Sequence, residues 1–399
     1  MRKTINIGDL GTIITGKTPP TTNKNYYGDY AVFIKPTDIS EQSKYTYETE
    51  EMYSRLAAEK YESSLIPKGA ICVPCIGTIG TKMTMAPCDC YTNQSINSIV
   101  CNDRYDNEYV YYLIKNFLPG LKSYNLGTAS GREYVSKSNF EKIELVAEQD
   151  KTIQKKIGEF LSRYDSLIEN YQKQIKLLEE AAQRLYKEWF IDLHFPEHEN
   201  TNIIDGVPEG WEKKKVNSII ELQSGFAFKS STFDDNGAYK IVTIKNVKDG
   251  AFDGDNVSKI VAIPDKMPKH CILADGDILL SLTGNVGRVC IVNGKNYLLN
   301  QRVAKLATGF KAFTYCLFRS RDMFIEVNNL ANGAAQQNVS PIRIGEMKIL
   351  LPNSELLQEF ESIVFKSIAR IISLQSQIRL LTEARDRLLP KLMSGEIEI

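Results

Sequence analysis

The feature that most constrains this sequence is an internal duplication. Blocks of the first half recur in the second half in the same order, at a nearly constant offset of roughly 207 residues. The paired blocks are 33–39 with 241–247, 68–73 with 275–280, 77–80 with 284–287, 93–94 with 300–301, and 131–136 with 335–340. Because the units of a solenoid are only about 20–50 residues long, this period instead predicts a duplicated domain, each copy followed by a long helix.

Each copy is expected to be an α+β domain rich in strands. Short apolar runs at 70–76 and 278–282 lie between Gly, Pro and Asp residues, which is typical of strands, and a helix is expected over 107–116. The predicted organisation is a first domain at 1–149, a first long helix at 150–190, a linker at 191–205, a second domain at 206–352 and a second long helix at 353–399.

The two predicted long helices carry apolar residues at heptad spacing. In the first, the pattern runs over 153–171 and, after a four-residue stutter, over 175–189; in the second it runs over 357–388, with only Ser367 and Arg385 as polar members. Heptads of this length indicate a coiled coil. Neither helix can bury its seam on its own domain, so we expect the two to pair antiparallel, in a pseudo-two-fold arrangement with one domain at each end.

Composition excludes several classes of protein. The 49 basic and 49 acidic residues give a formal net charge of zero, which excludes a strongly basic chain but not a local basic face. The sequence has no stretch of about 18 uninterrupted apolar residues, and residues 1–6 turn polar at once, unlike a secretory signal. The eight cysteines are therefore expected to be reduced thiols, and a cytoplasmic location is predicted.

Residues 11–18 match the phosphate-binding P-loop pattern GxxxxGK[ST]. A P-loop needs a helix that begins at the Lys-Thr step, whereas Pro19-Pro20 follows Lys17-Thr18 directly and residues 21–25 have no apolar helical face. The second copy has no lysine at this place. We interpret Lys17 as a loop cation, with a P-loop NTPase as a minor alternative.

Cys72 and Cys75, with a Cys-x-Cys run at 88–90, have a spacing that zinc sites use. Their counterparts in the second copy are Leu279 and Leu282, so burial as small apolar side chains is favoured over zinc binding. The chain contains no motif for base methylation, dinucleotide binding or ester hydrolysis. No catalytic or metal-binding residue is predicted, which favours a binding protein over an enzyme.

Two similar domains at a fixed separation suit a ligand that repeats in space, and duplex DNA is the obvious candidate. Residues 206–352 contain 19 basic and 14 acidic side chains, which supports this interpretation. Arg reads guanine, and Asn or Gln reads adenine, in the major groove. The candidate DNA-binding residues are Lys17, Lys35, Thr37, Asp38, Thr78, Arg132 and Tyr134 in the first copy, and Lys229, Lys245, Asn246, Asn285, Arg288, Arg302, Gln336, Gln337 and Asn338 in the second. Ordinary solvated loops are the alternative at each position.

Five segments of the chain carry a family resemblance. They are Leu185-Tyr186-Lys187-Glu188-Trp189-Phe190, Val207-Pro208-Glu209-Gly210-Trp211, Gly284-Asn285-Val286-Gly287, Asn300-Gln301-Arg302-Val303 and the closing run Leu388-Leu389-Pro390-Lys391-Leu392-Met393-Ser394-Gly395-Glu396-Ile397. With these segments the chain resembles the specificity (S) subunit of type I restriction-modification systems over its whole length. The closing run is the most specific match.

The resemblance implies two target recognition domains that together bind an asymmetric, bipartite DNA sequence, with an unread spacer set by the helices. It implies that two modification subunits bring S-adenosylmethionine and the adenine-methylating loop, and that restriction subunits bring ATP, Mg²⁺ and DNA cleavage. This chain would then be a non-catalytic subunit that holds no cofactor, in a bacterium or an archaeon. The recognition subunit of a standalone adenine methyltransferase without restriction is the alternative, and a pure coiled-coil adaptor is a further one.

The helix ends are candidate surfaces for these partner subunits. The apolar residues there are Trp189, Phe190, Leu388, Leu389 and Leu392, and packing against their own domain is an equally open alternative. The first copy departs from the family pattern at two positions, because Ser95 stands in the place of Arg302 and the sequence on the Met85 side of Gly80 has no arginine in the place of Arg288. Base-contact roles are therefore not carried over to those two positions.

Overall fold

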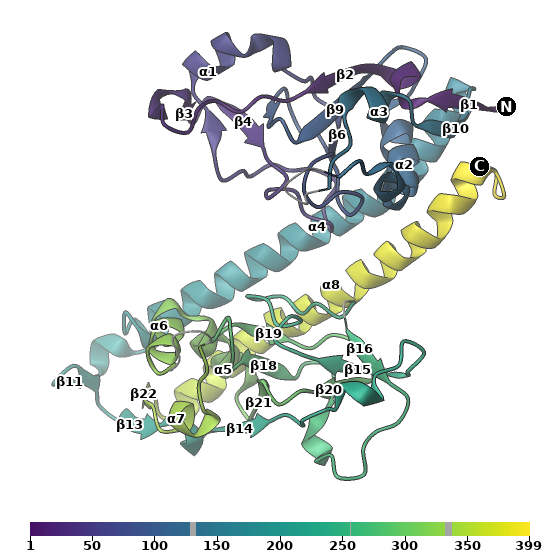
Figure 1. Ribbon diagram of the computed structural model, residues 1–399. Helices are drawn as coiled ribbons and strands as arrows, with labels where there is room; N and C mark the ends of the chain where they lie inside the picture. Colours follow the sequence, from purple (N-terminus) through teal and green to yellow (C-terminus); the bar gives the residue numbers. More distant parts are fainter. Residues whose placement is uncertain (128–132, 256, 332–336) are drawn as a thin grey trace. The chain divides into compact units, whose positions relative to one another are not determined.

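The chain folds into two compact units. The computed structural model describes residues 1–127, 133–255, 257–331 and 337–399. Unit 1 comprises Met1–Asn170 together with Leu380–Ile399, and unit 2 comprises Tyr171–Arg379 (Figure 1). Each copy of the sequence repeat therefore lies in its own unit.

Each unit contains a four-stranded antiparallel sheet with the same strand order. In unit 1 the order is β2 (Gly11–Thr15), β9 (Ile96–Cys101), β6 (Ile71–Pro74) and β7 (Thr84–Met85); in unit 2 it is β14 (Ile220–Ser224), β21 (Val303–Thr308), β18 (Ile278–Ser281) and β19 (Val289–Ile291). The two central strands of each sheet, β6 with β9 and β18 with β21, are mostly buried, as their apolar sequences predict. The sequence repeat is thus a repeat of topology.

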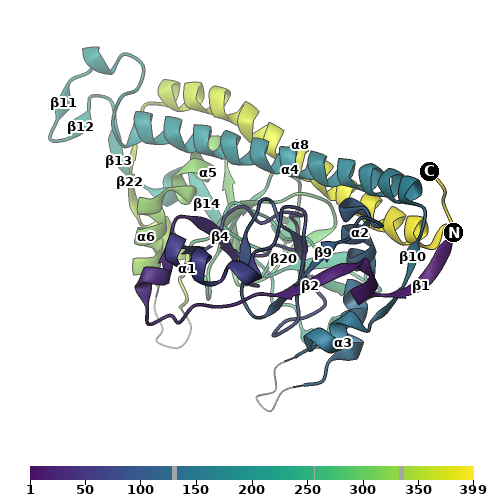
Figure 2. The same cartoon turned by 90° about the horizontal axis from the view of Figure 1, so that it is seen from above.

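A second sheet in each unit is built around one parallel strand pair. In unit 1, β4 (Ala31–Ile34) pairs with β8 (Tyr91–Thr92), and in unit 2, β15 (Tyr239–Val242) pairs with β20 (Tyr297–Leu299). The remaining strands of these sheets are β3 (Tyr27–Gly28), β5 (Met52–Tyr53), β16 (Ser258–Ile260) and β17 (Ile272–Leu273). The structure also has two-stranded antiparallel pairs. They are β1 (Arg2–Asn6) with β10 (Glu144–Glu148), β13 (Glu212–Lys215) with β22 (Lys348–Leu351), and the linker hairpin of β11 (Ile203–Ile204) with β12 (Val207–Pro208). Within unit 2 this hairpin projects past the end of α4 (Figure 2).

The helices of the two domains are short, and side chains cap most of their first turns. Unit 1 has α1 (Arg55–Lys60), α2 (Asn107–Phe117) and α3 (Lys137–Glu141), and unit 2 has α5 (Lys311–Arg319), α6 (Arg321–Asn329) and α7 (Pro341–Gly345). Asp106 caps α2 by accepting the Tyr109 amide at 3.0 Å. The start of α5 is capped from the long helix α8, because the Glu361 carboxylate accepts the amides of Ala312 and Phe313.

The two long helices are α4 (Lys151–Phe190) and α8 (Ser354–Ser394), and each has one part in each unit. In unit 1 the start of α4 shares a core with the end of α8, and in unit 2 the end of α4 shares a core with the start of α8. The helix halves therefore run antiparallel within each unit, where Figure 1 shows them side by side. The expected α+β domains and paired antiparallel helices are confirmed.

The polar heptad position Arg385 has a partner inside unit 1. Its guanidinium forms an ion pair with the Asp165 carboxylate of α4, and each side chain is only 6% exposed. The Tyr112 hydroxyl of α2 donates to the other oxygen of Asp165. One buried carboxylate thus connects both long helices to the domain.

The segment that matches the P-loop pattern is not a phosphate-binding loop. Residues 11–15 form β2, whose backbone pairs with β9 from Gly11 opposite Cys101 to Thr15 opposite Asn97. Within the fully described segment 11–60, the first α-helix is α1, so none begins at Lys17 and Thr18. The amides that a P-loop would turn toward a phosphate belong to a sheet, which excludes the NTPase interpretation.

Candidate nucleic-acid interface

Three loops of unit 2 meet at one end of its antiparallel sheet. We call them loop cluster 2: the turn 283–287, the loop 300–302 and the segment 337–339. The Leu282 amide donates to the Arg302 carbonyl at 3.0 Å, and the Gly284 amide donates to the Gln337 carbonyl at 2.9 Å. The Thr283 hydroxyl donates to the Asn338 side-chain oxygen at 2.8 Å. Three blocks that are far apart in the sequence are thereby joined into one polar surface.

Unit 1 builds an equivalent loop cluster 1 from the turn 76–80, the loop 93–95 and the segment 133–135. The Cys75 amide donates to the Ser95 carbonyl at 2.7 Å, and the Gly77 amide donates to the Glu133 carbonyl at 2.9 Å. These two bonds match the two backbone bonds of unit 2, whereas Ile76 stands in the place of Thr283 and cannot form its side-chain bond. The duplicated sequence blocks are therefore the ones that hold the two loop clusters together.

Glycines at both ends of each turn fix its shape. Gly77 and Gly80 have φ angles of +92° and +74°, and Gly284 and Gly287 have φ angles of +73° and +85°. A side chain would be strained in this left-handed conformation, which accounts for the glycines at these positions in both copies. The tip residues between them, Thr78 and Asn285, are exposed and differ in chemistry.

Two of the predicted DNA contacts hold a turn together instead. The Asp38 carboxylate accepts the amides of Lys35 at 2.8 Å and Glu50 at 3.2 Å. At the equivalent place in unit 2, the Asn246 side chain accepts the Thr243 amide at 2.8 Å and donates to the Asp253 carbonyl at 2.9 Å, and only 1% of the residue is exposed. Asp38 and Asn246, both predicted to bind DNA, therefore use these polar atoms within turns, and Asn246 is in addition buried.

The neighbours of these turn residues have different surroundings. Thr37 and Lys245, at equivalent positions of the repeat, are exposed. Lys35 is not a free cation, because its ammonium contacts Glu50 at 2.8 Å and Glu51 at 3.1 Å. Burial alone would lower the pKa of Lys35, but hydrogen bonds to these two carboxylates raise it above its usual value. These two contacts neutralise the positive charge of Lys35, which is therefore not available to attract a DNA phosphate.

The other predicted DNA contacts differ in exposure and in their distance from the loop clusters along the fold. Arg302, Gln337 and Asn338 are exposed in loop cluster 2, beside the tip residue Asn285. Tyr134 and Arg288 are half-buried next to their clusters, whereas Lys17 and Lys229 are exposed on other loops. Arg132 and Gln336 lie outside the described residues.

Sequence reasoning missed two exposed glutamines in these clusters. Gln94 lies in loop cluster 1, where its side-chain oxygen accepts a hydrogen bond from the Thr18 hydroxyl, and Gln301 holds the same place in loop cluster 2. The signal was present, since Asn93-Gln94 and Asn300-Gln301 form one of the repeated blocks.

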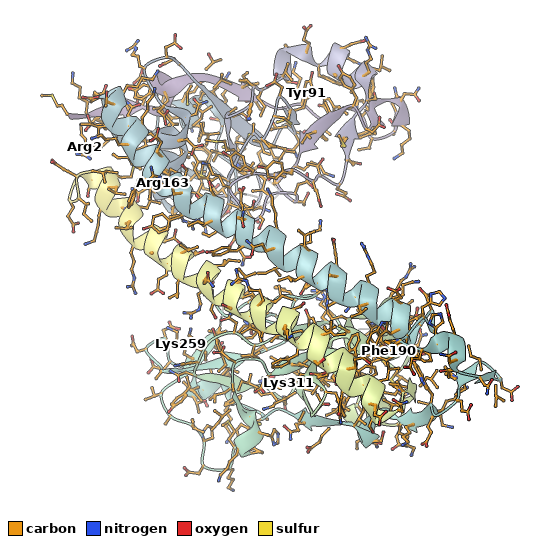
Figure 3. The ribbon with its side chains drawn as sticks, turned by 180° about the vertical axis from the view of Figure 1, so that it is seen from behind. Arg2, Tyr91, Arg163, Phe190, Lys259 and Lys311 are labelled. Atoms are coloured by element: carbon orange, nitrogen blue, oxygen red, sulfur yellow. The ribbon has the colours of Figure 1, made fainter. Side chains whose placement is uncertain are left out.

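The predicted partner contacts at the helix ends are also corrected. Trp189 and Phe190 are 6% and 7% exposed in the core of unit 2, and Leu389 and Leu392 are 5% and 1% exposed in the core of unit 1. Leu388 is half-buried against the same core. Figure 3 places Phe190 among side chains packed beside the first turns of α8. These residues pack against their own domains, which was the alternative interpretation.

Cys72 and Cys75 behave as apolar core residues, whereas Cys88 is exposed. Cys72 and Cys75 are buried, and burial raises the pKa of both thiols to about 12, so they stay protonated at neutral pH. Among the described residues, no group of three or more His, Cys, Asp or Glu side chains is arranged to hold a metal ion. No helix in the same residues has the length and apolar character that crossing a membrane requires.

Comparison with known proteins gives consistent results. The family model "Type I restriction modification DNA specificity domain" matches residues 2–180 and 208–382. A type I restriction enzyme MjaIX specificity subunit of Methanocaldococcus jannaschii is 29% identical over 406 residues, covering 98% of this chain and 93% of the relative. The MjaVIII specificity subunit of the same organism is 30% identical over 309 residues, covering 74% and 71%.

A solved structure supports the fold. The S subunit of a type I restriction-modification system from M. genitalium aligns with a TM-score of 0.58 at 17% identity, covering 98% of this chain and 96% of that one. The family model matches the chain twice, once over each copy of the duplicated domain with its loop cluster. The chain belongs to the type I restriction-modification DNA specificity family and is a DNA-recognition subunit of such a system.

Proposed function

We propose that the two loop clusters read the two halves of one asymmetric, bipartite DNA target. The observation that carries this proposal is that the same backbone hydrogen bonds build both clusters, while their exposed side chains differ. A shared framework would present each cluster to a groove in the same way, and different tips would select different bases. The target would be asymmetric because the two sets of tips are not alike.

The exposed side chains suit readout in the major groove. Loop cluster 2 presents Asn285, Arg302 and Gln337, which are types that form paired hydrogen bonds with adenine or guanine. Loop cluster 1 presents Thr78 and Gln94. We therefore expect the half-site read by unit 2 to depend on an arginine contact that unit 1 lacks.

The chemistry of modification and cleavage would come from other subunits. We propose that this chain is non-catalytic and holds no cofactor, and that two methyltransferase subunits supply S-adenosylmethionine and the adenine-methylating site. Restriction subunits would supply ATP, Mg²⁺ and cleavage. A standalone methyltransferase without restriction is the second candidate, and the genes beside this one distinguish the two.

Matched substitutions at the two turn tips test the assignment of half-sites. The chain is co-expressed with its methyltransferase subunit, and methylated adenines are mapped across the host genome. Thr78→Ala is expected to relax one half of the methylated sequence and Asn285→Ala the other, because one lost base contact removes about 1–3 kcal/mol of discrimination. Each variant is the control for the other. The proposal fails if both substitutions relax the same half-site, or if the wild-type complex methylates no defined sequence.

Lengthening both long helices tests whether they set the spacer. The chain passes between units inside α4 after Asn170 and inside α8 after Arg379. Four residues inserted at both points add about 6 Å and roughly 40° beyond a full turn to each helix, and leave the helix pairing inside each unit unchanged. Since one base pair spans about 3.4 Å, the unread spacer is expected to grow by one or two base pairs while both half-sites stay the same. Altered half-sites at an unchanged spacer, mapped in the same way, would contradict the spacer role.

A further inference from the structure

Unit 2 contains an arginine-lined pocket of which only Arg288 is among the predicted DNA contacts. The pocket has a volume of about 380 Å³ and is lined by Asp249, Arg288, Phe318, Arg319, Arg321 and Phe324. We propose that it binds a phosphate of the DNA backbone next to the half-site that unit 2 reads. This inference rests on the proposed function, and it adds a contact that fixes position without reading sequence.

The pocket adjoins loop cluster 2 directly. The turn 283–287 ends at Gly287, and Arg288 is the next residue. On the other side the turn contacts α6, where the Asn328 side chain donates to the Val286 carbonyl at 3.1 Å. A Cβ added at Gly287 would lie 3.1 Å from the Phe324 ring. A duplex whose bases reach the turn would therefore bring its backbone near the pocket.

One of the three arginines is held in place by neighbouring carboxylates. The Arg319 guanidinium forms an ion pair with Asp249 and lies 3.9 Å from Glu179 of α4. Glu179 in turn accepts the Tyr315 hydroxyl at 2.7 Å. Arg319 is therefore a fixed and largely neutralised wall of the pocket.

The other two arginines supply the net positive charge. Arg288 is half-buried and Arg321 is exposed at the start of α6. Among the described residues, no carboxylate lies within 4.0 Å of either guanidinium. The guanidinium fork matches the geometry of a phosphate and binds it strongly. Phe324, which is 41% exposed, offers an apolar face of the size that a deoxyribose ring would cover.

Unit 1 differs at the equivalent place. Thr81, which follows Gly80, stands where Arg288 follows Gly287. A Cβ added at Gly80 would lie 3.0 Å from the Lys122 side chain, where unit 2 has Phe324. The arginine pair thus belongs to unit 2, and we expect that unit to supply more of the sequence-independent affinity.

The test measures how DNA binding depends on salt. The full chain carrying Arg288→Gln and Arg321→Gln is co-expressed and purified with its methyltransferase subunit, and its affinity for the methylated target and for an unrelated duplex is measured between 50 and 200 mM salt, a range in which phosphate contacts weaken strongly. The slope of log affinity against log salt is expected to fall by about one to two, and affinity for both duplexes by a similar factor of roughly 5 to 30. The methylated sequence should stay unchanged.

Two controls accompany this double variant. Arg288→Lys with Arg321→Lys keeps both charges and should retain most of the salt slope. Lys213→Gln removes one exposed charge from β13 of the same unit and should leave the slope unchanged.

Two outcomes would contradict the phosphate site, and a third would contradict the proposed function. An unchanged slope in the double glutamine variant overturns the phosphate site. Loss of the methyltransferase subunit with an unchanged slope also overturns it, and assigns the pocket to an acidic protein surface. Failure of the wild-type complex to prefer any sequence would overturn the proposed function instead. The salt slope measured on the unrelated duplex, compared between the wild type and the double glutamine variant, would still test the phosphate site.

Discussion

Replacing Arg385 with alanine is expected to lower the free energy of unfolding of unit 1 by about 3–5 kcal/mol. The Asp165 carboxylate would remain buried, with Tyr112 as its hydrogen-bond donor but without its cationic partner. Burial alone would lower the pKa of Arg385, but Asp165 and the neighbouring Asp386 raise it above its usual value. Breaking such a pair costs more than the pair contributes, because the remaining charge has lost the water that would solvate it.

Hydrogen exchange of peptides from each unit, measured across a urea series, checks this prediction and locates the loss. Arg387→Ala is the matched control, because Arg387 lies two residues away on α8 with its side chain 76% exposed and pairs with the half-exposed Glu383. It should change stability by no more than about 0.5 kcal/mol. The double variant Asp165→Leu with Arg385→Leu should recover most of the loss, because it leaves no unpaired charge. A loss no larger than that of the Arg387 control would refute the structural role of the pair.

Phe360→Ala is expected to destabilise unit 2 by about 3–5 kcal/mol. Phe360 of α8 is 0% exposed, and its ring centre lies 4.9 Å from that of Phe190 and 5.7 Å from that of Trp189. The cavity would open between the two long helices at the point where both enter the core of the domain. Neighbouring aromatic rings relax only partly into such a space. The variant therefore loses van der Waals contacts in addition to the free energy gained by removing the phenyl ring from water.

The same exchange experiment checks this result, with peptides of unit 2 as the readout. Phe365→Ala on the same helix is the control, because that side chain is 47% exposed, and it should cost much less. Phe360→Leu should fall between the two, since it leaves a smaller cavity. Equal losses for Phe360→Ala and Phe365→Ala would show that the helix pairing in unit 2 does not depend on this core.

Much of the fold could be predicted from the sequence, because its strongest signals repeat. The duplicated blocks predicted two domains of one topology, and the structure has the same strand order in both. The heptads predicted long paired helices, and α4 and α8 span Lys151–Phe190 and Ser354–Ser394. Arg385 was visible as a polar interruption, but its partner Asp165 could not be predicted, since only the helix register brings the two together.

The individual site residues were harder to predict, because sequence does not say where a polar side chain points. Asp38 and Asn246 are residue types that read bases, yet the same atoms also close turns, and the structure uses them in turns. Trp189 and Phe190 are apolar at a helix end, which fits a partner surface or a core equally well. The choice depends on Trp211, Phe313 and Phe360, which come from three distant parts of the chain.

The discontinuous make-up of unit 1 has a consequence for how the chain is made. Its first segment, Met1–Asn170, leaves the ribosome early, but its core also needs Leu389, Leu392 and Met393 of the final segment. Arg2 in the first strand donates to the carbonyls of Leu392 and Met393. All of unit 2 is synthesised between these two segments. Unit 1 is therefore begun before unit 2 but completed after it, and part of its apolar surface stays uncovered until Leu380–Ile399 has been synthesised.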